Sequence, residues 1–244
     1  MEAMMDNQIN ILAIPMSFMS GLLAWLLAIL LQKLFVRCRA GQKITLGDQC
    51  GKTIEPIPTK LPWLYAVISV LVMAPVCFFF GFGIQVTYVV FILALFLAVS
   101  VVDIKYRLIP NSFVLGIIGV RVAWMIAPYL HGVTPEIWLN LRESAIGILL
   151  CFMIFFGGTL LTGGKVGMGD VKLSMAIGFV LGWRGALTAI ALSGILMIPF
   201  MFTQPGMNVK DRFKQMVPFG PPFSLAAMLV LTADFTPLAR YMQF

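Results

Sequence analysis

Long apolar segments separated by short polar stretches run along the whole sequence. An α-helix rises about 1.5 Å per residue, so about 20 mostly apolar residues are needed to cross a hydrocarbon layer of about 30 Å. The pattern predicts eight apolar helices, at residues 9–34, 62–82, 84–102, 111–130, 144–162, 171–182, 186–203 and 218–239. We therefore expect an all-α fold, a polytopic membrane bundle of about eight transmembrane helices.

The sixth and seventh segments are counted separately because of their combined length. A continuous helix over residues 171–203 would be about 50 Å long, well beyond the hydrocarbon thickness. The sequence Gly182-Trp183-Arg184-Gly185 can form a turn between the two segments. We therefore predict a break in the helix at this point.

The distribution of basic residues agrees with this count and orients the bundle. With eight spans, 13 of the 17 Lys and Arg residues fall on one side, three on the other, and Arg121 lies within a span. Since Lys and Arg collect in cytoplasmic loops, we expect the 13-residue side in the cytoplasm and both termini outside. Residues 1–61 then form a first helix with a basic cytoplasmic loop at 35–61, and residues 62–244 form the main membrane domain.

Composition excludes most alternatives to a membrane protein. The chain is 60% hydrophobic and 11% charged, whereas a soluble domain has about 25% charged residues. A soluble enzyme, a disordered protein and a secreted disulfide scaffold are therefore excluded, and the lipid bilayer is the expected surrounding. The net charge of +7 follows from membrane topology, so we expect no nucleic-acid partner.

Two acidic residues stand at the ends of apolar segments. Asp103 ends the third segment and Asp170 opens the sixth, which places both at the cytoplasmic ends of their helices, where they could meet across the bundle. Charged groups at membrane depth are costly and are functional candidates. Two neighbouring carboxylates can share a proton, so that one draws a proton from water while the other polarises a carbonyl. This is the chemistry of aspartic proteolysis.

Other roles for these acids stay open at this point. Asp170 could simply cap a helix, whereas Asp103 would meet the negative end of its own helix dipole. A transporter or proton pathway could use both acids as relay groups, although no inverted repeat is evident, and a non-catalytic assembly protein would not require both. For a peptidase, the dipoles favour Asp170 as the base that activates water and Asp103 as the acid on the scissile carbonyl.

Three motifs favour the peptidase. Residues 102–111 (VDIKYRLIPN) and 167–172 (GMGDVK) resemble the two active-site signatures of the type IV prepilin peptidases, which are membrane aspartic endopeptidases of the Gly-x-Gly-Asp class. Residues 217–221 (VPFGP) resemble the Pro-Phe-Gly-Pro element before that family's last span. The resemblance covers roughly residues 84–240.

The resemblance implies a specific activity. The family cleaves the basic leader from prepilins and pseudopilins of type IV pilus and type II secretion systems, at the cytoplasmic face of the bacterial inner membrane. The resemblance makes Asp103 and Asp170 the catalytic pair, and this hydrolysis requires no metal or nucleotide. The partner expected for this chain is therefore a prepilin or pseudopilin.

Several other residues are candidates for substrate binding or for support of the site. Gly167 and Gly169 lack a Cβ atom, so a substrate strand could approach their backbone closely. Lys105 and Lys172 flank the two acids and could tune them, although flanking positive charges are also ordinary topology signals. Arg121 is a candidate partner for an acidic residue in the substrate's apolar helix, with snorkelling or pairing to another span as the alternative.

The N-terminal third departs from the family pattern. Many members also N-methylate the new N-terminus with S-adenosylmethionine, and their first cytoplasmic loop carries two Cys-x-x-Cys pairs with spacing suited to zinc. Here the loop has only Cys38 and Cys50. We therefore predict no metal site and a peptidase without methyltransferase activity, with S-adenosylmethionine as a cofactor only if that second activity is retained.

Overall fold

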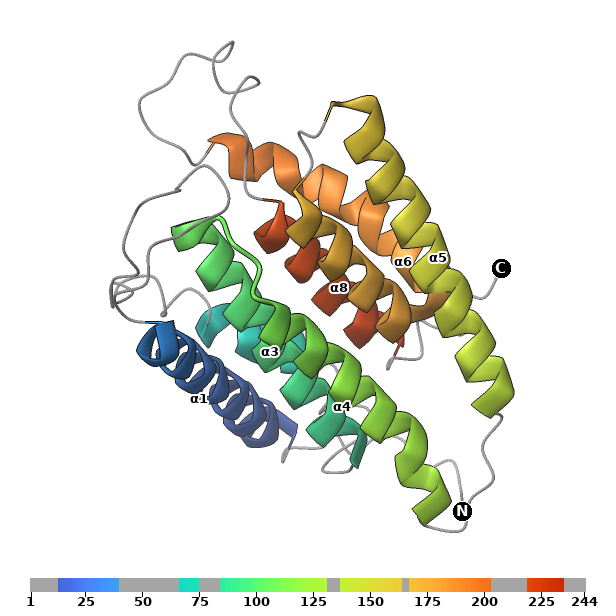
Figure 1. The fold of residues 1–244 in the computed structure, drawn as a ribbon. Coiled ribbons are helices and arrows are strands. Elements are labelled where there is room, and N and C mark those ends of the chain that lie inside the picture. Colours follow the sequence, from blue (N-terminus) through green and yellow to red (C-terminus); the bar gives the residue numbers. More distant parts are fainter. Residues whose placement is uncertain are drawn as a thin grey trace.

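Every regular element in the described residues is an α-helix, as expected. The computed structural model describes residues 13–39, 66–74, 84–130, 137–163, 167–202 and 219–234. Residues 66–74 form a short helical stretch. The longer helices are α1 (Ala13–Arg39), α3 (Ile84–Tyr106), α4 (Asn111–Leu130), α5 (Ile137–Leu161), α6 (Met168–Phe202) and α8 (Gly220–Asp234) (Figure 1).

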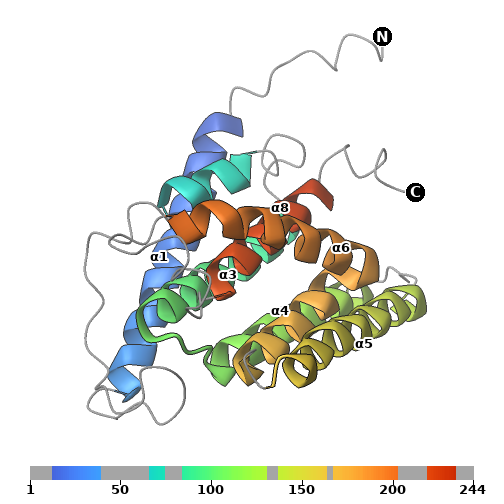
Figure 2. The same ribbon diagram turned by 90° about the horizontal axis from the view of Figure 1, so that it is seen from above.

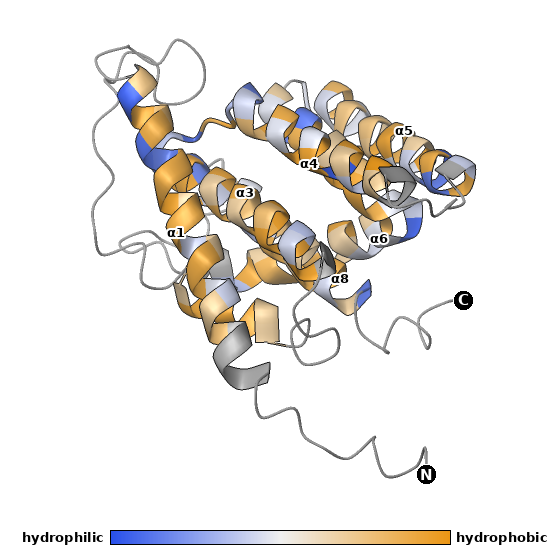
Figure 3. Ribbon diagram, turned by 90° about the horizontal axis from the view of Figure 1, so that it is seen from below, coloured by the Kyte–Doolittle hydropathy of each residue, from blue (hydrophilic) through white to orange (hydrophobic). Residues whose placement is uncertain are grey.

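Among the described residues, four helices are long and apolar enough to cross a membrane. They are α1, α3, α5 and α6, and the apolar part of α4 is shorter. Figure 3 shows hydrophobic residues along the length of these helices. The structure therefore supports a helical membrane protein, while the count of eight spans and the orientation remain predictions.

Helix α3 lies at the centre of the bundle. Every residue from Ile92 to Asp103 is buried, and α3 packs against α1, α4 and α8. A helix that is apolar on all sides can be surrounded in this way without leaving a polar face unpaired. The consequence for function is that Asp103 stands at the end of a helix whose position is fixed by neighbours on several sides.

The predicted break within residues 171–203 is confirmed. Gly182 has φ 69° and ψ −176°, which is not a helical conformation, and glycine tolerates a positive φ because it has no Cβ atom. Figures 1 and 2 show that the second half of α6 runs back toward the end where α8 begins. Both ends of α6 therefore lie toward the same end of the bundle.

Helix ends differ from the predicted ones by several residues. Helix α1 continues to Arg39 instead of ending at 34, α3 continues to Tyr106 instead of ending at 102, and α6 begins at Met168 instead of 171. The apolar pattern marks the hydrocarbon layer, whereas a helix continues for as long as its backbone hydrogen bonds do. Most of the predicted basic loop 35–61, from residue 40 onward, lies outside the described residues, and so do Cys50 and the zinc prediction.

Candidate active site

The two predicted acids line one cavity. The cavity has a volume of about 300 Å³ and lies between the turn that joins α3 to α4 and the beginning of α6. Its polar lining comprises Asp103, Arg107, Asn111, Asp170 and Lys172. Residues 67 positions apart in the sequence therefore meet at one end of the bundle, as the topology predicted.

Asp103 occupies a buried position in the last turn of α3. Its side chain is 5% exposed, and its Oδ2 accepts a hydrogen bond of 3.0 Å from the backbone N–H of Gly220. Gly220 is the first residue of α8, so the carboxyl of Asp103 faces the positive end of that helix.

Asp170 is the third residue of α6 and is only half-buried. Its carboxyl reaches back to the backbone N–H of Gly167, which precedes the helix. A side chain at the third helical position that bonds the N-cap amide satisfies one of the free donors of the helix start. The charges of Asp103 and Asp170 act on each other across the cavity.

In this geometry, helix dipoles no longer favour one of the two carboxyls as the base and the other as the acid. The expectation was that Asp103 meets only the negative end of α3, whereas Asp170 meets the positive end of α6. In the structure, Asp103 also bonds the first amide of α8. Both carboxyls therefore face a helix N-terminus, and the dipoles do not distinguish them.

A tight turn between α3 and α4 forms one wall of the cavity. Arg107 has φ 49°, and its N–H donates to the carbonyl oxygen of Asp103 at 2.7 Å. This left-handed conformation closes many helices but usually falls on glycine, and in an L-residue it costs about 1 kcal/mol. Pro110 follows, and its carbonyl oxygen accepts from Phe113 as α4 begins. The first motif is therefore the segment that ends one helix and starts the next.

The start of α6 forms the opposite wall and packs closely against this turn. A Cβ atom added to Gly169 would lie 3.2 Å from Cβ of Ile109, so the second glycine of the motif allows α6 to approach the turn. Gly167 lines the cavity. Lys172 Nζ donates to Asn111 Oδ1 at 3.3 Å, which links α6 to the first residue of α4.

Two of the predicted supporting residues do not line the cavity. Lys105 lies over the ring of Tyr106, with 5.3 Å from Nζ to the ring centroid. Arg121 interacts with Tyr88 of α3 and electrostatically with Asp234 of α8. This arrangement favours the alternative in which Arg121 pairs with other helices of its own chain.

Sequence reasoning did not place Gly220 in the site. The sequence identifies VPFGP only as a motif before the last helix, and nothing in its residue types indicates a bond to Asp103. The two prolines after Gly220 were the available signal, since they leave the start of α8 with few amide donors.

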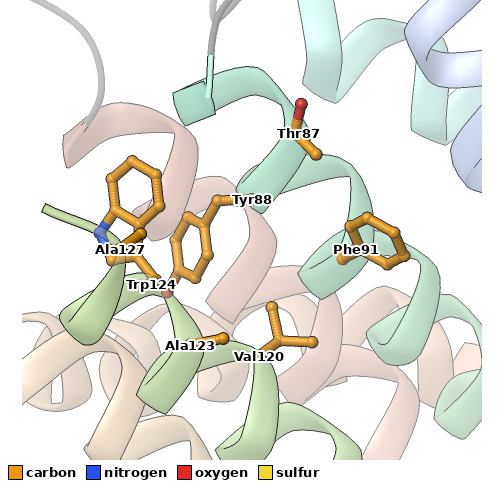
Figure 4. A pocket seen from close by; sticks show the side chains of 7 residues that line it. All are labelled: Thr87, Tyr88, Phe91, Val120, Ala123, Trp124 and Ala127. Atoms are coloured by element: carbon orange, nitrogen blue, oxygen red, sulfur yellow. The ribbon is translucent and has the colours of Figure 1, made fainter. Parts of the chain in front are cut away.

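A second cavity of about 300 Å³ lies between α3 and α4 but belongs to a different region (Figure 4). Its lining is almost entirely apolar, and Tyr88 and Trp124 stack at 4.7 Å between ring centroids. Phe91, which also lines it, is 12 residues before Asp103. That separation corresponds to about 18 Å along the axis and about 120° around the helix, so this cavity does not face the two acids.

The sequence is similar to those of prepilin leader peptidases. The Type IV leader peptidase family matches residues 89–202, a range that contains both Asp103 and Asp170. The prepilin leader peptidase/N-methyltransferase of Legionella pneumophila is 23% identical over 193 residues, which cover 77% of this chain and 64% of that protein. The protein of the same name from Pseudomonas aeruginosa is 25% identical over 209 residues, covering 82% of this chain and 68% of that protein. No solved structure matches the chain.

Fold and site together define a helical membrane protein with two carboxylates in one cavity. Over residues 89–202 the chain is similar to the type IV leader peptidase family, and the curated relatives that it matches are named prepilin leader peptidases. It spans about two thirds of the length of the curated relatives that it matches.

Proposed function

We propose that this protein is a membrane aspartic endopeptidase that removes the basic leader from type IV prepilins or pseudopilins. The observation that carries the proposal is the shared cavity of Asp103 and Asp170. The printed names of its relatives, which describe prepilin leader peptidases, supply the substrate class.

We base the roles of the two acids on how exposed each carboxyl is. Asp170 is the more exposed carboxyl, so water reaches it more easily, and it acts as the base. Asp103 is the more buried carboxyl and lies farther from water, so it acts as the acid. One proton shared between the two carboxyls suits both tasks, because like charges close together resist double ionisation.

The reaction then proceeds by addition and elimination. Asp170 takes a proton from water, whose oxygen forms a bond to the scissile carbonyl carbon. Asp103 donates its proton to the carbonyl oxygen, which stabilises the charge that develops there. The tetrahedral intermediate collapses when the carbon–nitrogen bond breaks, and the leaving amine takes the proton that Asp170 had accepted. One hydroxyl of the intermediate returns its proton to Asp103, which leaves a carboxylic acid and restores the shared proton.

The active site faces the cytoplasm of a bacterial inner membrane in this proposal. Lys105, Arg107 and Lys172 all lie at the end of the bundle that holds the two acids, and positive charge marks the cytoplasmic side. The substrate's basic leader would then approach from the cytoplasm while its apolar helix stays in the bilayer.

We propose that the N-methyltransferase activity in the relatives' names is absent from this protein. The loop 35–61 has two cysteines, Cys38 and Cys50, and no histidine, which is too few ligands for a structural zinc site. Elemental analysis of the purified protein should show no stoichiometric zinc. Zinc that disappears when Cys38→Ser and Cys50→Ser are combined, or a methylated product in the presence of S-adenosylmethionine, would contradict this part.

Cleavage of a purified prepilin in detergent tests the function. The wild-type protein should release the leader, and Asp103→Ala and Asp170→Ala should not. Asp234→Asn is the matched control, because Asp234 ends α8 and does not line the cavity, and it should cleave. A folded wild-type protein that leaves the prepilin intact would reject the peptidase and favour an ion pathway or an assembly role.

A further inference from the structure

The start of α8 offers an unusual set of backbone donors. A helix normally begins with four N–H groups that lack partners within the helix. In α8 the second and third residues are Pro221 and Pro222, which have no N–H. The N–H of Phe223 donates to the carbonyl of Phe219 at 3.2 Å. The amide of Gly220 is therefore the donor that the first turn directs outward, and it bonds Asp103.

The same position leaves no room for a side chain. A Cβ atom added to Gly220 would lie 2.5 Å from Oδ2 of Asp103 and 3.0 Å from its Cγ. The hydrogen bond and a side chain at residue 220 are therefore incompatible unless the carboxyl of Asp103 moves.

Aromatic packing holds this turn in place independently of Asp103. The ring of Phe219 lies 5.3 Å from that of Phe155 on α5 and 5.2 Å from that of Phe223 on α8, and Phe155 and Phe223 are 5.4 Å apart. Aromatic pairs at such distances stabilise one another beyond the area that they bury. The amide of Gly220 is thus presented by a rigid support.

We propose that Gly220 is a positioning residue for the peptidase, because its amide holds Oδ2 of Asp103 and leaves Oδ1 to carry the proton that reaches the substrate carbonyl. A carboxyl oxygen without the acidic proton is the better acceptor, so the N–H bond favours protonation at the other oxygen. Only that oxygen is then free to donate. This inference rests on the proposed function, since it concerns how Asp103 is oriented for cleavage.

Gly220→Ala, compared with Gly157→Ala, tests the proposal. Gly157 lies within α5, and a Cβ atom added there would meet nothing within 4 Å. We expect Gly220→Ala to lower kcat for prepilin cleavage about 3–10-fold, the factor that corresponds to losing a hydrogen bond between neutral groups. KM should stay within about twofold, since the bond orients Asp103 and does not bind substrate. The pH–rate profile should also move, whereas Gly157→Ala should match wild type in all three measurements.

Thermal unfolding separates this effect from simple misfolding and does not depend on cleavage. Gly220→Ala should lower Tm in the wild-type background, and most of that loss should disappear in the Asp103→Ala background, where the carboxyl is absent. Equal losses in the two backgrounds would show that residue 220 does not act through Asp103.

Two kinetic results would also overturn the proposal. One is a Gly220→Ala variant with wild-type kcat, and the other is a loss confined to KM with an unchanged pH profile. If the wild-type protein itself fails to cleave prepilin, the proposed function fails, while the coupling of Tm between residues 103 and 220 still reports on the contact.

Discussion

Asp103 and Asp170 reach one cavity from different surroundings. Asp103 ends a helix buried on several sides, is 5% exposed, and bonds a helix that starts 117 residues later. Asp170 begins a helix, is half-buried, and bonds an amide three residues earlier. The position of Asp103 therefore depends on tertiary packing, whereas Asp170 is held largely by its own local motif.

The largest losses of kcat should follow substitution of the two carboxyl groups. Asp170→Asn removes the base and should lower kcat by about 10³–10⁴-fold, at the upper end of what general base catalysis contributes. Asp103→Asn keeps an N–H donor toward the substrate and an acceptor for Gly220, so it should lose only about 10²-fold. Steady-state cleavage assays with purified variants check this, and a greater loss at Asp103 would reverse the assigned roles.

The pH dependence of kcat should differ between the wild-type protein and the two Asn variants. Two carboxyls that share one proton titrate as a unit, so the wild-type kcat should follow a bell-shaped profile with an acidic and a basic limb. Each Asn variant has one titrating carboxyl left, and its residual activity should follow a single limb. A bell that persists in both variants would show that other groups set the limbs.

Substituting the glycines of the second motif should have a smaller effect, on the free energy of unfolding. Gly169→Ala would press against Ile109 and should lower the free energy of unfolding by about 1–3 kcal/mol, a typical cost of overpacking. Gly167→Ala meets only Oδ2 of Asp170 at 3.4 Å, so its effect should stay below about 0.5 kcal/mol. Denaturation in detergent measures both. Ile109→Ala should restore most of the loss at residue 169, and its failure to do so would contradict the contact.

The smallest effect, a change in Tm, is expected for a substitution at the rim of the cavity. Lys172→Met removes the 3.3 Å bond to Asn111, which is an exposed contact. Such contacts contribute about 0.5–1 kcal/mol, so Tm should fall by only a few degrees. A loss as large as that of Gly169→Ala would mean that this bond, instead of close backbone packing, holds α6 against α4.

Much of this architecture could be read from the sequence. Hydropathy located the helices, and length together with Gly182 predicted the break in α6, because both depend on local composition. The topology also predicted that Asp103 and Asp170 share one end of the bundle and could meet there. Helix ends were missed, since backbone hydrogen bonding continues beyond the apolar residues.

The contacts around the acids could not be read in the same way. The bond from Gly220 to Asp103 and the proximity of Gly169 to Ile109 join segments far apart in sequence. They depend on how helices pack, which no short motif encodes. Arg121 illustrates the same point, because its interactions with Tyr88 and Asp234 come from three different helices.

The central claim is that the two carboxyls act as one catalytic unit, and a double variant tests it most directly. Residues that act together show strongly non-additive losses, because removing one already disables the other. The kcat of Asp103→Asn/Asp170→Asn on a purified prepilin should therefore equal that of Asp170→Asn alone. A double variant whose loss is the product of the two single losses would contradict the account.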